Sequence, residues 1–138
     1  MKLSLKYKIG ILVLYYVVLI ISIVFKFFNK EYLTIDFVKD YNNYKIFYFY
    51  VLNKEYCIQI LLNIVSFIPL GFLLIYNIRK YKILVTSILI LLSSLSFEVI
   101  QLEFKIGVFD INDIVFNYFG GLIGITIYFL LSKKFIDK

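Results

Sequence analysis

ILVTSILILLSSLSFEVIQL, residues 83–102, is a continuous apolar run that carries a single charged residue, Glu98. A helix needs about 20 predominantly apolar residues to cross the hydrocarbon core of a bilayer, so this run predicts a membrane-spanning helix. Three further runs meet the same requirement, at about residues 9–28, 57–76 and 111–131. All four must be helices, because lipid cannot satisfy backbone polar groups. The sequence therefore predicts an all-α, polytopic membrane protein: a bundle of four transmembrane helices forming a single domain over residues 1–138.

Composition and charge narrow the class of protein further. Hydrophobic residues make up 62% of the chain, against about 45–50% in a soluble domain. There is no histidine, and Cys57 is the only cysteine, which excludes His-assisted nucleophilic catalysis, His-ligated or thiolate metal sites and an intrachain disulfide. We therefore expect no metal and no cofactor. The net charge of +6 does not indicate nucleic-acid binding, because the lysines lie at helix ends and form no basic face interleaved with aromatic residues.

The distribution of basic residues predicts the orientation in the membrane. Three basic residues precede the first span, three lie between the second and third spans, and three follow the fourth, accompanied by one acid, Asp137. The other two connections mix lysines with acids. Since cytoplasmic segments carry the excess of Lys and Arg, we expect both termini in the cytoplasm of a bacterial cell and the two mixed connections outside.

The first outward connection, about residues 29–56, is rich in tyrosine and phenylalanine and contains a short apolar run at 46–52. Tyrosine favours the headgroup level of a bilayer, where one end of the side chain is wet. An aromatic belt that anchors the helices is the simpler interpretation. A lid or a lipid-contacting platform on the outer surface is the functional alternative.

Polar side chains recur within the spans, toward the expected extracytoplasmic side. Glu98 and Gln101 are three residues apart and share a helix face, as do Asp113 and Asn117, which are four apart. An ionisable group in a membrane helix costs roughly 2.5–3.5 kcal/mol, so the two carboxylates favour a functional site over a packing role. We expect one shared, water-accessible pocket inside the bundle. Its candidate residues are Asn63, Glu98, Gln101, Asp110, Asp113 and Asn117.

Two questions about this pocket stay open in the sequence. The amides of Asn63, Gln101 and Asn117 are equally suited to interhelical hydrogen bonds that only set the packing. The negative charge also needs an offset, because the last three spans contain no Lys or Arg. Lys105, the only cation in the short connection after residue 102, is one possible counter-ion. Protons shared between the acids or a bound cation are the other two.

Small residues and one proline predict where the helices pack and bend. Gly120 and Gly124 form a G-x-x-x-G pattern with Gly121 beside them, which permits close approach of another helix, and packing within the chain is the simpler interpretation. Pro69, with Gly71 close behind it, is expected to break and kink the second span, because proline removes the hydrogen bond to the carbonyl four residues earlier.

Several motifs, in this order, resemble the VanZ-like family of bacterial membrane proteins. They are NIVSFIPLGF at residues 63–72, Glu98-x-x-Gln101, FDIND at residues 109–113, and then Asn117, Gly120, Gly121 and Gly124. The similarity covers about residues 57–130. One position departs from the family pattern: an arginine usually lies three residues before the first aspartate, where this chain has Gly107. The resemblance implies a polytopic membrane protein linked to low-level resistance to teicoplanin-type glycopeptides, without an established reaction.

Three functions are consistent with these features. The leading hypothesis is a non-enzymatic envelope protein whose outward pocket binds an amphiphile at the outer leaflet: a membrane lipid, a lipid-linked cell-wall molecule or a glycopeptide antibiotic with a lipid tail. The first alternative is an enzyme that acts on a lipid-linked envelope substrate, with Glu98 and Asp113 as an acid/base pair; the absence of histidine counts against it. The second is a small proton-coupled transporter, although the first span lacks the acid expected at its centre.

Overall fold

A computed structural model describes residues 4–28, 54–104 and 109–136 of the chain. The described residues form four α-helices and no strand: α1 (Leu5–Phe28), α2 (Lys54–Asn77), α3 (Lys82–Glu103) and α4 (Ile111–Ile136). Each helix is long and apolar enough to cross a membrane. The predicted all-α bundle of four spans is therefore confirmed, and every predicted span lies inside an observed helix. The aromatic connection, Lys105 and Gly107 lie outside the described residues.

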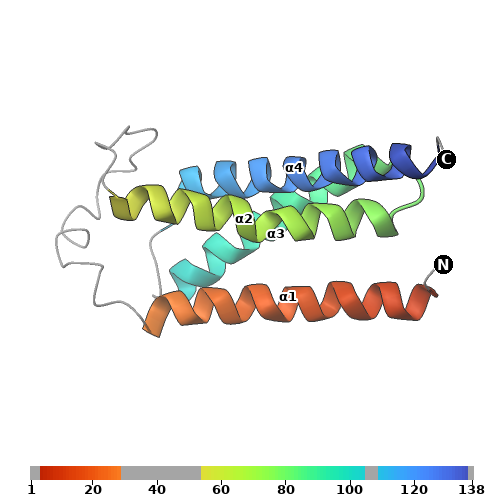
Figure 1. The fold of residues 1–138 in the computed structure, drawn as a ribbon. Coiled ribbons are helices and arrows are strands. Elements are labelled where there is room, and N and C mark those ends of the chain that lie inside the picture. The colour runs from red at the N-terminus through yellow and green to blue at the C-terminus, as the bar shows by residue number, and fades with distance from the viewer. Residues whose placement is uncertain (1–3, 29–53, 105–108, 137–138) are drawn as a thin grey trace.

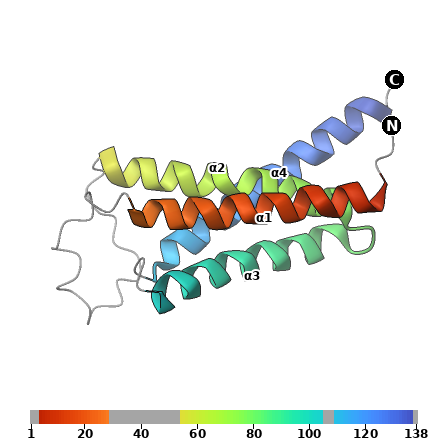
Figure 2. The ribbon, with the colours of Figure 1, turned by 90° about the horizontal axis from the view of Figure 1, so that it is seen from below.

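The four helices run roughly along one axis (Figure 1). α2 and α4 lie side by side and run in the same direction, α3 crosses them on one side, and α1 lies against the outside of this three-helix core (Figures 1 and 2). The start of α1, the end of α4 and the short turn between α2 and α3 lie at the same end of the bundle. We call this the turn end, after residues 78–81. We call the opposite end, where α3 finishes and α4 begins, the cavity end, because a small internal cavity lies toward it.

Glycines allow α2 and α4 to pack backbone against backbone. A Cβ atom on Gly120 would overlap the carbonyl of Ile64, and one on Gly124 would overlap the carbonyl of Ile68. A Cβ atom on Gly71 of α2 would likewise overlap the backbone of Gly121. Close approach of this kind needs small residues at the contact. The G-x-x-x-G stripe thus packs against α2 of the same chain.

Pro69 does not interrupt α2, which is one continuous helix from Lys54 to Asn77 with Pro69 inside it. The expected kink at Pro69 stays a prediction. Membrane helices tolerate proline where neighbouring groups satisfy the backbone that it leaves without a partner. Pro69 deprives the carbonyl of Val65 of its donor, and the neighbouring carbonyl of Ser66 accepts a hydrogen bond from the Tyr15 hydroxyl of α1 at 2.6 Å.

The apolar core lies between α2, α3 and α4, where Leu70, Ile75 and Ile90 are completely buried. α1 is different: only 6% of its span is buried, against 28–33% for the other three. Tyr16 holds α1 to α3 through its hydroxyl, which lies 2.7 Å from the hydroxyl of Ser93. Most side chains of residues 5–22 of α1 are therefore exposed on the outside of the bundle.

Candidate functional site

A small cavity lies inside the bundle toward the cavity end, and all four helices contribute to its wall. Its volume is about 40 Å³, which is room for a few water molecules at about 10–15 Å³ each. The lining contains both polar and apolar side chains. The lining residues are Leu19, Ser22, Asn63, Ser66, Phe67, Phe97, Glu98, Gln101 and Asn117. Four of the candidate residues from the sequence therefore meet here: Asn63, Glu98, Gln101 and Asn117.

Glu98 is the most deeply buried of these side chains, with 1% of its surface exposed. Its Oε2 accepts a hydrogen bond from the backbone N–H of Asp110 at 2.9 Å. Asp110 immediately precedes α4, and its Oδ1 accepts a hydrogen bond from the backbone N–H of Asn112 at 2.8 Å, which is the geometry of a helix N-cap. Glu98 thus ties the end of α3 to the start of α4, where the helix dipole favours negative charge.

Asn117 links α4 to α3 inside the core. Its Nδ2 donates a hydrogen bond to Ser94 Oγ at 2.9 Å, and the residue is 5% exposed. Its Oδ1 is buried and accepts no hydrogen bond from the described residues. Because Asn117 lines the cavity, this acceptor is available to a water molecule or to another small donor there.

Two predicted site residues lie beside the cavity without lining it. Asp110 acts as the N-cap of α4, a role that its position directly before the helix could have suggested. Asp113 lies in the first turn of α4 and is half-buried, where a carboxylate is favoured by the helix dipole. Asp113 is not among the residues that line the cavity, and the expected pairing of Glu98 with Asp113 stays a prediction. Lys105, one possible counter-ion, lies outside the described residues.

An apolar layer separates the cavity from the turn end. The rings of Phe67 and Phe97 meet edge to face, with 6.0 Å between centroids. Closer to the turn end, Leu70 and Ile90 are completely buried, and Ile90 packs beside Gly121. In the described part of the chain, apolar side chains thus lie between the cavity and the turn end.

The serine hydroxyls around the cavity were not predicted from the sequence. Ser22 of α1 and Ser66 of α2 line it, and Ser94 holds Asn117. Serine in a membrane helix commonly bonds to the carbonyl four residues earlier, as Ser22 does to Val18 at 2.9 Å, so serine alone is a weak signal. A better signal was the position of Ser94 four residues before Glu98, on the same face of α3.

Among the residues that the structure describes, no group of three or more His, Cys, Asp or Glu side chains is placed to hold a metal ion.

Comparison with known proteins supports the resemblance that the sequence motifs indicate. The profile of the VanZ/LLP1 family matches residues 12–132. Protein VanZ of Enterococcus faecium is 40% identical over 76 residues, which are 55% of this chain and 47% of that protein. The chain thus matches about half the length of this curated relative. No solved structure matches the chain. Because the family profile covers most of the chain, including every helix that builds the cavity, the protein belongs to the VanZ/LLP1 family.

Proposed function

We propose that this multi-pass membrane protein contributes to low-level resistance to teicoplanin-type glycopeptides, and that the cavity is its functional centre. The observation that carries the proposal is the buried carboxylate of Glu98 beside the amides of Asn63 and Asn117, within membrane-spanning helices. Carboxylates at such depth are costly and usually mark function. Membership of the VanZ/LLP1 family and the similarity to Protein VanZ support the envelope role.

The proposed orientation puts the turn end in the cytoplasm. Arg79, Lys80 and Lys82 lie at or beside the α2–α3 turn, and Lys6 and Lys8 lie at the start of α1. The excess of basic residues belongs on the cytoplasmic side. The cavity end would then face the outer leaflet, where cell-wall lipids and lipoglycopeptides are found.

The proposed ligand is an amphiphile, and the size of the cavity limits how it binds. Pockets that enclose a drug-sized ligand are about 300–1,000 Å³, so a cavity of about 40 Å³ cannot enclose a headgroup or an acyl chain. We infer that the amphiphile lies along the outside, where α1 meets α2 and α3. One polar group of the ligand would reach Glu98 and Asn117. The loose packing of α1 favours this position, because little has to be displaced.

The test is the resistance that the protein confers on a susceptible host. Glu98→Gln keeps the volume and hydrogen-bonding capacity of the side chain but removes the charge, so it should abolish teicoplanin tolerance. Glu103→Gln is the matched control, because Glu103 is an exposed acid at the end of the same helix; it should leave tolerance unchanged. The measurement is the minimum inhibitory concentration, with the membrane level of each variant checked by blot.

A further comparison separates acyl-chain recognition from a general envelope effect. Vancomycin lacks the lipid tail of teicoplanin, so the protein should protect less against vancomycin if it recognises the tail. Full teicoplanin tolerance in a well-expressed Glu98→Gln variant would contradict the proposal and reduce Glu98 to a packing residue.

A further inference from the structure

A second polar cluster lies at the turn end, far from the cavity. Each helix contributes one side chain to it: Lys8 from α1, Tyr76 from α2, Lys82 from α3 and Tyr128 from α4. The Lys8 ammonium lies 3.9 Å from the centre of the Tyr76 ring, and Lys82 Nζ donates to the Tyr128 hydroxyl at 3.3 Å. The two tyrosine rings meet edge to face with 6.3 Å between centroids. We call these four residues the Lys–Tyr cluster.

The Lys–Tyr cluster brings two positive charges together, and none of the acids whose side chains the structure describes lies beside them. Both ammonium groups interact electrostatically with the Tyr128 hydroxyl, and all four side chains are half-buried. The acids whose side chains the structure describes lie at the cavity end; they are Glu98, Glu103, Asp110 and Asp113. Like charges held near one another repel, and the repulsion is stronger where water is partly excluded. An anion bound between Lys8 and Lys82 would convert this repulsion into attraction.

The position of the cluster indicates what the anion is. Tyr76 lies in the last turn of α2, and Lys82 is the first residue of α3, so both lie at the end of a membrane span. This is the headgroup level, where lysine and tyrosine extend polar tips toward the interface. Basic pockets between membrane helices bind anionic lipid headgroups. A zwitterionic choline lipid fits less well, because Lys8 already occupies the face of Tyr76 that a quaternary ammonium would use.

We propose that the Lys–Tyr cluster binds the phosphodiester of an anionic phospholipid, with phosphatidylglycerol as the simplest example. Lys8 and Lys82 bind the phosphate oxygens from opposite sides, and the Tyr128 hydroxyl, which Lys82 orients, donates a third hydrogen bond. The bound lipid joins the start of α1 to α3 and α4, at the end where α1 has few protein contacts. This site is separate from the cavity and does not depend on the resistance function.

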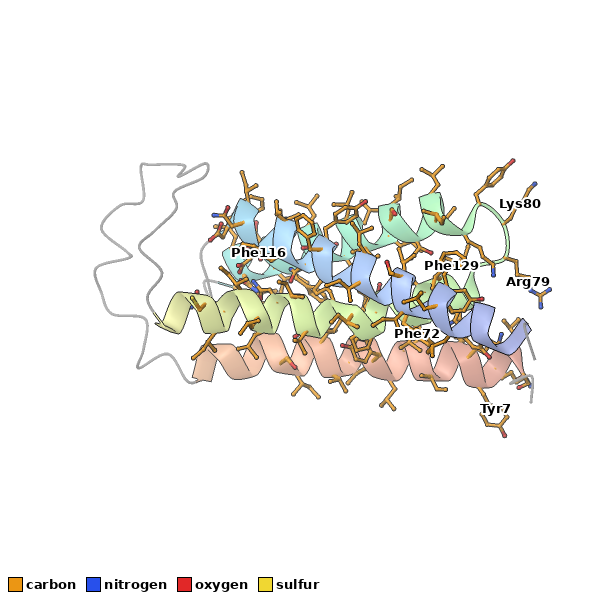
Figure 3. All side chains as sticks on the ribbon, turned by 45° about the horizontal axis from the view of Figure 1, so that its top comes forward. Tyr7, Phe72, Arg79, Lys80, Phe116 and Phe129 are labelled. Carbon is orange, nitrogen blue, oxygen red and sulfur yellow. The ribbon has the colours of Figure 1, made fainter. Side chains whose placement is uncertain are left out.

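The chain offers a matched pair of variants for the test. Lys8→Gln combined with Lys82→Gln removes two charges from the cluster. Arg79→Gln combined with Lys80→Gln removes two charges from exposed side chains at the same end, which extend outward from the turn (Figure 3). General attraction of the basic end to an anionic membrane would be weakened equally by both pairs. Binding at a specific site formed by the Lys–Tyr cluster would be weakened only by the Lys8 and Lys82 pair.

The experiment uses the full chain in an uncharged detergent, titrated with phosphatidylglycerol, phosphatidylcholine or inorganic phosphate. Thermal unfolding is followed by circular dichroism, and bound lipid is counted by native mass spectrometry. Phosphatidylglycerol should raise the midpoint in a saturable way, and the other two should not. Each lysine near a charged lipid surface is worth about fivefold in affinity, so the cluster variant should bind phosphatidylglycerol about 25-fold more weakly, and the exposed pair should bind it as the unaltered chain does.

Three results would overturn the proposal. If both variant pairs weaken phosphatidylglycerol binding equally, the binding is a general attraction to the basic end. If phosphatidylcholine stabilises the protein as much as phosphatidylglycerol does, the site is not specific for anionic lipids. If inorganic phosphate stabilises it equally, the site binds free phosphate and not a lipid. If the cluster variant is unstable even in phosphatidylcholine, the double variant Lys8→Arg and Lys82→Arg is used in its place to test the site. This variant keeps both charges and should retain phosphatidylglycerol binding, and loss of binding there would also refute the site.

Discussion

Replacing Gly120 by alanine should separate α2 from α4 and destabilise the whole bundle. A Cβ atom at this position would meet the carbonyl oxygen, carbonyl carbon and Cα of Ile64, all of them backbone atoms of α2. A flexible side chain could rotate away, but a helix backbone moves only as a whole. The added methyl group must therefore push the two helices apart along their close contact.

The size of the effect follows from two opposing terms. Overpacking in a tight interior costs about 1–3 kcal/mol, and this contact lies at the severe end because no side chain can yield. The change from glycine to alanine favours the helix by up to about 1 kcal/mol. We expect a net loss of about 1–2 kcal/mol in the free energy of unfolding.

Gly10→Ala is the matched control for this substitution. Gly10 lies in α1, and no atom lies within 4 Å of a Cβ added there, so only the favourable helix term remains. Gly121→Ala should fall between the two, because its Cβ would meet the side chain of Ile90, with Cδ1 at 2.6 Å, and that side chain can repack. The free energy of unfolding would be measured by sodium dodecyl sulfate titration in mixed micelles, followed by far-ultraviolet circular dichroism. If Gly120→Ala were as stable as Gly10→Ala, the backbone contact between α2 and α4 would not be what holds the bundle together.

Two further predictions concern α1 and the orientation. A double-mutant cycle with Tyr16→Phe and Ser93→Ala should give a coupling of about 0.6 kcal/mol, the average for a hydrogen bond between membrane helices, because the two hydroxyls lie 2.7 Å apart; zero coupling would mean that this bond does not hold α1 against α3. In a Cys57→Ser background, a membrane-impermeant maleimide added to intact cells should label a cysteine at Lys105 and not one at Lys80; labelling at Lys80 would reverse the proposed orientation and turn the cavity toward the cytoplasm.

The polar residues show both the reach and the limit of sequence reasoning. Helical spacing placed Glu98 with Gln101 on one face, and depth placed Asn63 and Asn117 at a similar level; all four line the cavity. The same spacing argument put Asp113 on one face of its helix with Asn117, yet Asp113 does not line the cavity. Spacing defines the angle of a side chain about its own helix axis, but the rotation of that helix against its neighbours depends on packing. For α4 the backbone contact of Gly120 with α2 sets that rotation.

The sequence by itself determined the four helices and their bounds to within a few residues. The length and apolarity that a bilayer requires are local properties, and each span meets them without help from the others. Only the tertiary structure decided that the glycine stripe of α4 packs on α2, that Ser22 of α1 lines the cavity, and that the cavity is the size of a few waters. These features depend on which helix faces meet and how closely. That choice is made by the sum of many small contacts between distant segments, which no local pattern encodes.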